Sequence, residues 1–159
     1  MNHLNELAAR VGQALTEGKR TLATAESCTG GLIGHAITNA PGSSAYYIGG
    51  VVAYANAVKT GLLTVSLDDL EKHGAVSATV ARQMAQGARR RLHADCGLGV
   101  TGVAGPGGGG PDKPVGLVWV AADVAGDTAV REHRFSGDRG EIKEQAAAAA
   151  LELLLETLS

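Results

Sequence analysis

Short β-prone segments alternate with helical segments along this chain, and this alternation restricts the fold more than any other feature. Apolar residues between positions 4 and 15 recur at helical spacing, which predicts an amphipathic helix that stops near Gly18. A β-prone segment at 21–25 follows, and residues 26–31 lead it directly into a second helical segment at 32–39. The stripe of the first helix consists of Leu4, Leu7, Ala8, Val11 and Leu15.

The rest of the chain continues the alternation. Residues 46–55 are apolar and partly β-branched, which predicts a strand that places Val52, Tyr54 and Asn56 on one face. Ser66, Ser77 and Asp138 stand where they can cap three later helices. These helices are expected after Ser66, at 77–92 and at 138–158, and further strands are expected at 97–100, 115–124 and 128–135.

This order of elements predicts an α/β fold with three layers, α/β/α, in which helices cover both faces of a mixed sheet. A chain of 159 residues is long enough to bury one substantial core. No internal repeat or linker divides it, so we expect residues 1–159 to form a single domain.

Composition excludes several classes of protein. Lys and Arg number 14 against 16 Asp and Glu, so no positive field is available to hold a nucleic acid. No stretch of about 18 apolar residues and no secretory leader is visible, which argues against a membrane partner and against secretion. Cys28 and Cys96 are the two cysteines, and a domain of this size needs no disulfide, so we expect a cytoplasmic protein.

Ser27 is the first candidate for chemistry. It follows a β-prone segment and precedes a helix, where free backbone N–H groups suit an attacking alkoxide and the oxyanion that it creates. The neighbouring Cys28 is a rival nucleophile, because a thiol at a helix start can have a lowered pKa. Ser27 or Thr29 could also serve simply as an N-cap, and local sequence leaves these roles open.

A serine nucleophile needs a base, and the five histidines show no spacing that directs one of them at Ser27. Lys59 is the alternative, because a short turn after the strand that carries Tyr54 could bring its amine and the phenol to one point beside Ser27. Lys59 must be neutral to act as a base, which burial in an apolar pocket can achieve.

Residues 101–110 form a glycine-rich segment between two predicted strands. Successive glycines let backbone N–H groups converge on an anion such as a phosphate. The segment lacks the G-x-x-x-x-G-K-[ST] and G-x-G-x-x-G arrangements, so neither ATP hydrolysis nor a dinucleotide site is indicated. A flexible surface loop remains the alternative. Histidines are dispersed and the two cysteines are isolated, so we expect no metal.

Five segments, taken in order, resemble the CinA C-terminal family, whose members include stand-alone nicotinamide-nucleotide amidases. They cover nearly the whole chain. The segments are Ala-Glu-Ser-Cys-Thr-Gly-Gly at 25–31, Tyr54-Ala55-Asn56 with Lys59, Gly-Ala-Val-Ser at 74–77, Thr-Gly-Val-Ala-Gly-Pro at 101–106 and Lys-Pro-Val-Gly at 113–116.

The resemblance implies a hydrolase without metal or cofactor that converts nicotinamide mononucleotide to nicotinate mononucleotide and ammonia. Ser27 matches the family's nucleophile, and Tyr54 and Lys59 match its Tyr and Lys. Longer relatives carry an N-terminal domain for which this chain has no room, and a homo-oligomer is expected from the resemblance. The residues expected to contact the pyridine mononucleotide are Cys28, Thr29, Gly30, Gly31, Asn56, Thr101, Gly102, Gly105 and Arg139.

Two functions are therefore compatible with these residues. In the first, backbone N–H groups at 28–30 hold the oxyanion, and the glycine-rich segment or Arg139 holds the phosphate. In the second, the same phosphate site serves a non-catalytic regulatory protein that binds a pyridine nucleotide. Release of ammonia distinguishes the two.

Overall fold

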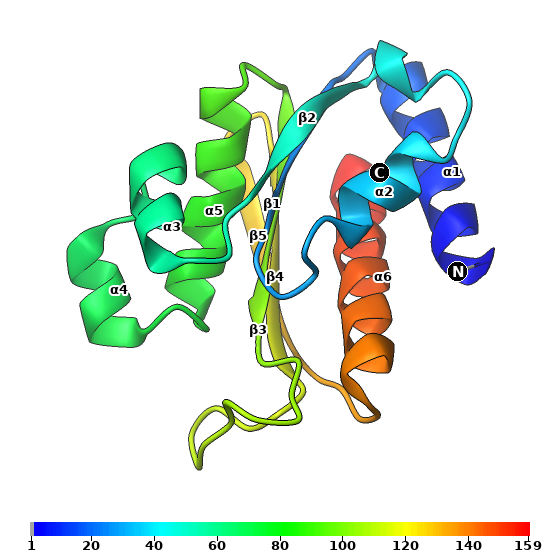
Figure 1. The fold of residues 1–159 in the computed structure, drawn as a ribbon. Helices are drawn as coiled ribbons and strands as arrows, with labels where there is room; N and C mark the ends of the chain where they lie inside the picture. The colour runs from blue at the N-terminus through cyan, green and yellow to red at the C-terminus, as the bar shows by residue number, and fades with distance from the viewer. Residues whose placement is uncertain (1) are drawn as a thin grey trace.

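A five-stranded mixed sheet lies between two layers of helices in the computed structural model, which describes residues 2–159 (Figure 1). The middle strand β3 and its neighbour β1 run parallel to each other, and β1 is also parallel to the edge strand β2. β4 is antiparallel to both β3 and β5. Across the sheet the strands are β2 (Tyr47–Val52), β1 (Leu22–Glu26), β3 (Cys96–Gly102), β4 (Leu117–Val124) and β5 (Asp127–Arg134).

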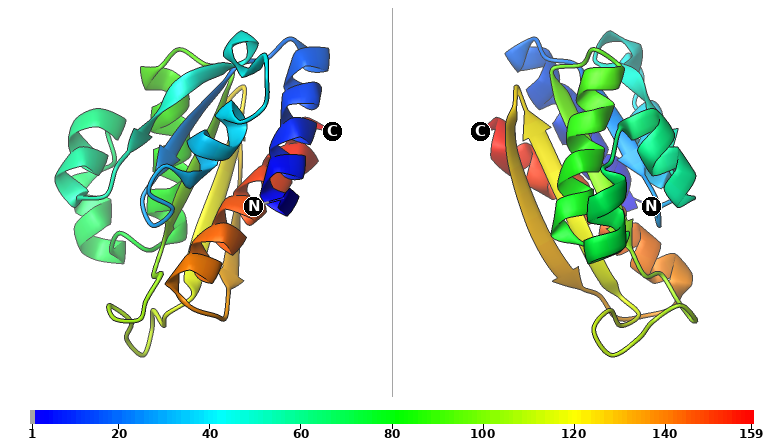
Figure 2. Two further views of the ribbon diagram at one scale, coloured as in Figure 1. Left: turned by 45° about the vertical axis from the view of Figure 1, so that its right-hand side comes forward. Right: turned by 90° about the vertical axis from the view of Figure 1, so that its left-hand side faces the viewer.

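Each face of the sheet carries its own helices (Figure 2). α1 (Asn2–Gly18), α2 (Leu32–Thr38) and α6 (Arg139–Leu158) cover one face and bury the larger apolar cluster. α3 (Asn56–Leu63), α4 (Leu67–His73) and α5 (Ala78–Arg91) cover the other. A short 3-10 turn, η1 (Ser43–Ala45), precedes β2. The predicted three-layer α/β fold with a mixed sheet is confirmed.

The predicted helix starts are also confirmed by side-chain caps. Ser66 Oγ accepts the N–H of Asp69 at 3.2 Å, and Ser77 Oγ accepts the N–H of Val80 at 3.2 Å. Asp138 and Glu141 exchange hydrogen bonds in a capping box at the start of α6. These bonds satisfy N–H groups that the first turn of a helix leaves without a partner.

The strand predicted at 46–55 is shorter than expected, and a helix that was not predicted follows it. β2 ends at Val52, and α3 begins at Asn56, so Tyr54 and Asn56 do not share a strand face with Val52. Periodicity could not reveal α3 because its buried positions are only Lys59 and Leu63. A lysine on the buried side of a helix is not counted as apolar.

α3 is held close to α5 by a glycine. A Cβ built on Gly87 of α5 would lie 2.1 Å from the carbonyl oxygen of Leu63, at the end of α3. Only glycine permits this approach, which also fixes the helix that carries Lys59.

We therefore expect Gly87→Ala to lower the free energy of unfolding by about 1–3 kcal/mol, because a backbone carbonyl must shift to admit the methyl group. Gly61→Ala is the matched control within α3, since no atom lies within 4 Å of its added Cβ. The control should leave stability unchanged or raise it by up to about 1 kcal/mol. Urea denaturation measures both. Equal stability of the two variants would show that α3 and α5 are not in close contact here.

Candidate active site

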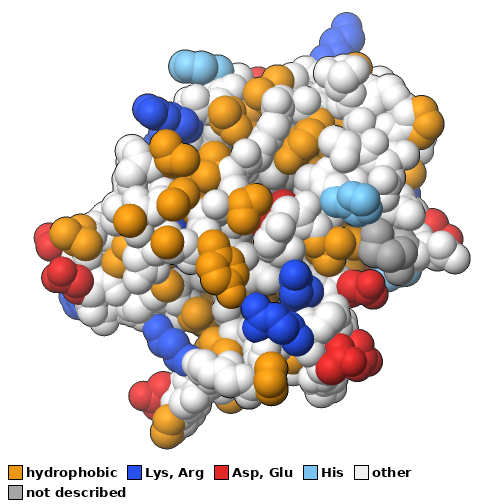
Figure 3. All heavy atoms as spheres, viewed as in Figure 1, with side chains coloured by type: hydrophobic (Ala, Val, Ile, Leu, Met, Phe, Trp, Pro, Cys, Tyr) orange, Lys and Arg blue, Asp and Glu red, His pale blue; other side chains and the backbone are white. Residues whose placement is uncertain are grey.

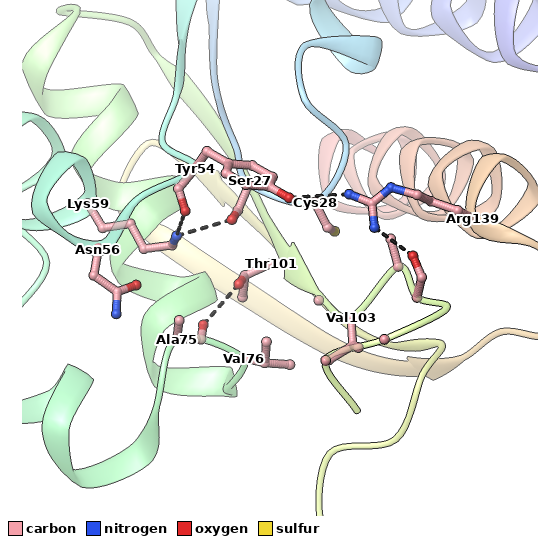
Figure 4. Close-up of a pocket in the computed structure, with 15 residues that line it drawn as sticks. Ser27, Cys28, Tyr54, Asn56, Lys59, Ala75, Val76, Thr101, Val103 and Arg139 are labelled. Atoms are coloured by element: carbon pink, nitrogen blue, oxygen red, sulfur yellow. Dashed lines mark hydrogen bonds between the residues drawn. The ribbon is translucent and has the colours of Figure 1, made fainter. Parts of the chain in front are cut away.

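The carboxyl ends of the three parallel strands meet at one edge of the sheet, where α/β folds commonly bind ligands. Ser27 follows β1, Tyr54 comes two residues after β2, and β3 ends at Gly102. A pocket of about 290 Å³ opens at this edge (Figure 4). Its lining consists of Ser27, Cys28, Tyr54, Asn56, Lys59, Ala75, Val76, Thr101, Gly102, Val103, Ala104, Gly105, Gly107, Gly108 and Arg139.

Ser27 and Lys59 are in direct contact in this pocket. Lys59 Nζ lies 3.1 Å from Ser27 Oγ, although the two residues are 32 positions apart in the chain. The backbone N–H of Ser27 donates to Val100 of β3 at 3.0 Å, which ties the backbone of this residue to the sheet. α3 supplies Lys59 from the opposite side. The structure therefore brings together the two residues that the sequence proposed as nucleophile and base.

Lys59 is 1% exposed, and its amine has two further partners. It donates to the carbonyl oxygens of Ala53 at 2.8 Å and Tyr54 at 3.1 Å. An ammonium would donate to all three oxygens, whereas a neutral amine has two N–H donors and one lone pair and could donate to the two carbonyls while accepting from the hydroxyl of Ser27. The geometry therefore suits an amine that accepts the serine proton.

Burial also lowers the pKa of Lys59 from its ordinary 10.5, because the desolvated ammonium is disfavoured, and a smaller effect of Cys28 opposes the shift. Among residues 2–159, no carboxylate forms a salt bridge with this lysine. The positive form thus lacks the partner that usually stabilises it in a protein interior.

The sequence predicts that the phenol of Tyr54 lies beside the amine of Lys59, but the structure places it elsewhere. Its hydroxyl instead accepts a hydrogen bond from Arg139 at 3.2 Å, and the side chain is exposed (Figure 4). The cause is the early end of β2, which lets the chain turn so that the carbonyl of Tyr54 faces Lys59 while its side chain faces α6. Tyr54 therefore contacts Lys59 through its backbone carbonyl.

The turn after Ser27 lies behind the pocket, and three of the expected contact residues, Thr29, Gly30 and Gly31, are absent from its lining. Thr29 is buried and donates to Glu26, while the N–H of Gly30 donates to the carbonyl of Ser27 at 3.1 Å. The expectation that the Gly30 N–H holds an oxyanion is therefore wrong. Within the described turn 27–32, the N–H groups that donate to no backbone carbonyl and no carboxylate are those of Cys28, Thr29 and Gly31.

The glycine-rich loop forms the lower wall of the pocket. Gly105 accepts a hydrogen bond from Arg139 at 2.6 Å, which connects this loop to α6. The hydroxyl of Thr101 donates to the carbonyl of Ala75 at 2.9 Å, so it is occupied by a protein contact. On the outer side, Lys113 donates to the carbonyl of His73 and holds the loop beside the end of α4.

Several lining residues were not among the expected contacts. Ala75 and Val76 come from the connection between α4 and α5, and Val103, Ala104, Gly107 and Gly108 come from the glycine-rich loop. Their side chains are small or apolar, so no chemical signal marks them in the sequence. Ala75 and Val76 do lie in the segment 74–77 that carries part of the family resemblance.

Cys28 lines the same pocket, but its thiol is poorly suited to attack. Burial raises its pKa to about 12, and the charge of Glu26 adds to this effect, while its own backbone N–H and the more distant Lys59 and Lys143 oppose it. A thiol with so high a pKa is almost entirely protonated near neutral pH. The environment therefore favours Ser27 over Cys28 as the nucleophile.

No group of three or more His, Cys, Asp or Glu side chains within residues 2–159 is arranged to hold a metal ion. None of the helices in these residues combines the length and the hydropathy needed to span a membrane. Both cysteines are free and buried.

Comparison with known proteins identifies the family. The sequence model of the CinA C-terminal domain matches residues 4–158. The chain belongs to the CinA C-terminal domain family. It is 52% identical to a CinA-like protein of Salinibacter ruber over 153 residues and 50% identical to one of Gemmatimonas aurantiaca over 150 residues. These matches cover 96% and 94% of this chain but 37% and 35% of the relatives, so it spans about a third of their length.

Solved CinA structures share the whole fold. The competence/damage-inducible protein CihA of Agrobacterium tumefaciens superposes with a TM-score of 0.94 at 43% identity, covering 97% of this chain and 94% of that one. A CinA superfamily protein of Klebsiella pneumoniae superposes with a TM-score of 0.94 at 35% identity, covering 98% and 97%. The arrangement of sheet and helices is thus that of the CinA family.

The raised pKa of Cys28, together with that of Cys96, which burial raises to about 11, predicts slow thiol chemistry. We expect iodoacetamide at pH 8 to alkylate the native CinA-family chain about 100-fold or more slowly than the same chain in urea, because the thiolate is scarce and buried. Mass spectrometry of timed samples measures both rates. Rapid native labelling of Cys28 would contradict this description of its environment.

Proposed function

We propose that this chain is an amidase that hydrolyses nicotinamide mononucleotide to nicotinate mononucleotide and ammonia. The observation that carries the proposal is the buried amine of Lys59, which lies at hydrogen-bond distance from Ser27 Oγ and donates to two backbone carbonyls. The choice of substrate rests on the resemblance of the five sequence segments to nicotinamide-nucleotide amidases. Ser27, Lys59 and Tyr54 are the residues to which the proposal assigns the reaction.

In the first half of the proposed reaction, Lys59 accepts the hydroxyl proton of Ser27, and Oγ attacks the carboxamide carbon of the substrate. The resulting tetrahedral intermediate carries a negative oxygen, for which the backbone N–H of Cys28, the residue after Ser27 in the pocket lining, is the proposed donor. Lys59 then returns the proton to the amide nitrogen. The C–N bond breaks, ammonia leaves, and the acyl group remains as an ester on Ser27.

Water completes the proposed cycle. Lys59, neutral again, removes a proton from the water as its oxygen attacks the ester carbonyl. Collapse of the second intermediate breaks the bond to Oγ, which takes the proton back from Lys59. The carbonyls of Ala53 and Tyr54 stabilise the ammonium while it exists, because both accept its hydrogen bonds. Tyr54 therefore assists through its carbonyl in this scheme.

The phosphate of the substrate is proposed to lie between Arg139 and the glycine-rich loop. Arg139 lines the pocket, and its guanidinium already contacts Gly105 of the loop and the hydroxyl of Tyr54. Lys and Arg side chains gather on this face of the molecule beside the loop, as the space-filling view shows (Figure 3). A guanidinium can bind two phosphate oxygens at once, which makes Arg139 a suitable partner.

Ammonia release from nicotinamide mononucleotide tests the function directly. An amidase releases ammonia in many turnovers, whereas the regulatory alternative binds the nucleotide stoichiometrically and releases none. Isothermal titration on the same preparation separates the two results. Binding without ammonia would overturn the proposal in favour of a regulatory protein.

Replacement of the two candidate nucleophiles gives opposite expectations. Ser27→Ala should lower kcat by about four orders of magnitude or more, because no other group can form the ester. Cys28→Ala should retain most of the activity, since its thiol is protonated and serves only as part of the wall. A coupled ammonia assay measures both. Loss confined to Cys28→Ala would assign the attack to the thiol.

The rate should also depend on the protonation of Lys59. We expect kcat/KM to rise with pH and to level off with a midpoint below 10.5, because burial lowers the pKa of Lys59 and only the neutral amine is a base. Lys59→Arg keeps the charge but cannot give up its proton near neutral pH, so kcat should fall about 100- to 10,000-fold. Wild-type kcat in Lys59→Arg would show that the residue only positions other groups.

The phosphate site predicts discrimination between the mononucleotide and its riboside. Nicotinamide riboside should have a kcat/KM about 10- to 100-fold lower, because hydrogen bonds to a charged group contribute about 1.5–3 kcal/mol. Arg139→Gln should reduce this discrimination and raise KM for the mononucleotide. Equal kcat/KM for both substrates in the wild-type enzyme would remove the role of the phosphate site.

A further inference from the structure

Glu26, the residue directly before the proposed nucleophile, is a buried carboxylate that forms no salt bridge with a cation among residues 2–159. It is 2% exposed, lies at the end of β1, and does not line the pocket. Its oxygens accept three hydrogen bonds: from the hydroxyl of Thr29 at 2.6 Å, from the N–H of Ile33 at 2.9 Å and from the N–H of Gly34 at 3.1 Å. Burial of a carboxylate costs desolvation free energy, so its presence here calls for a structural or functional reason.

Two of these hydrogen bonds occupy N–H groups in the first turn of α2. Ile33 and Gly34 are the second and third residues of that helix, and their N–H groups would otherwise be free to bind an anion. Because Glu26 occupies them, the helix end is not available to the substrate. The proposed oxyanion donor is therefore in the turn itself, at the N–H of Cys28, which lines the pocket.

The same residue is connected to the base. The carbonyl of Glu26 accepts the N–H of Ala53 at 2.7 Å, and the carbonyl of Ala53 accepts the amine of Lys59 at 2.8 Å. On the other side, the N–H of Ser27 donates to Val100. The backbone of Glu26 is thus connected to Lys59 through Ala53, while its side chain binds the turn after Ser27 through Thr29.

We propose that Glu26 is a positioning residue. It holds the turn with Ser27 and the amine of Lys59 in the relative position that the reaction requires, and it does not contact the substrate. This inference rests on the proposed amidase function for its assay. The side chain must be a carboxylate because it accepts three hydrogen bonds and donates none. Glutamine has one acceptor oxygen, and its NH2 group would face a donor, so the turn would relax.

Glu26→Gln tests the proposal in the full chain. We expect kcat for nicotinamide mononucleotide to fall about 10- to 100-fold, because a small misplacement of reacting groups has this effect. KM should stay within about twofold and the pH midpoint should not move, since the substrate contacts and Lys59 remain. Glu17→Gln, an exposed change on α1, should match the wild type. A folded Glu26→Gln enzyme with wild-type kcat, or one in which only KM rises, would overturn the proposal.

Thr29 provides a second test in case Glu26→Gln does not fold. Thr29→Val removes the hydroxyl that donates to Glu26 and keeps the shape of the side chain, so kcat should again fall with little change in KM. Thr29→Ser restores the hydroxyl and should recover most of the loss. Equal kcat in the Val and Ser variants would contradict a positioning role for this hydrogen bond.

A fluorophosphonate probe separates failure of this inference from failure of the amidase proposal. It labels an activated serine without requiring a nucleotide, so its rate reports the reactivity of Ser27 alone. If the wild-type chain is labelled at Ser27 but releases no ammonia, the proposed substrate is wrong while the role of Glu26 is still measured by labelling. Undiminished labelling in Glu26→Gln would overturn the role of Glu26.

Discussion

The burial of one amine without a carboxylate partner is the constraint on which the rest of the site depends. A lysine ammonium is costly to bury, and proteins usually offset this cost with a negative charge. Here Lys59 is surrounded by two carbonyl oxygens and one hydroxyl, which can satisfy a neutral amine as well as an ammonium, so burial rather than hydrogen bonding disfavours the charged form. The nearest acidic residue along β1, Glu26, directs its carboxylate to the opposite side, toward α2. Burial therefore lowers the pKa of Lys59, and the hydroxyl of Ser27 lies at hydrogen-bond distance from its amine.

The fold produces this arrangement by sending the chain to opposite faces after two adjacent parallel strands. The chain leaves β1 toward α2 on one face and leaves β2 toward α3 on the other, so the turn with Ser27 and the helix with Lys59 meet at the strand ends (Figure 1). β3 contributes the wall through Thr101 and the glycine-rich loop, and α6 contributes Arg139. With Ala75 and Val76 from the connection between α4 and α5, five distant parts of the chain form the pocket, and no single segment contains a complete site.

Periodicity and capping residues were sufficient to predict the layers, because the stripe of α1 and the caps at Ser66, Ser77 and Asp138 are local signals. The contact of Ser27 with Lys59 was predicted only as a possibility, since it depends on a helix that the pattern of α3 does not reveal. The direction of the Tyr54 phenol and the three partners of Glu26 depend on where β2 and β1 end. Tertiary packing decides those ends, so local sequence could not provide them.

An NMR titration of the Lys59 side chain measures the central property of this site. With lysine selectively labelled at the ε-carbon and Lys59→Met used for assignment, the ε-carbon shift follows the protonation of this amine alone. We predict a midpoint clearly below the ordinary 10.5, because burial without a carboxylate disfavours the ammonium. A midpoint at or above 10.5 in the folded protein would mean that Lys59 is a stable cation, and it would contradict its assignment as the base that activates Ser27.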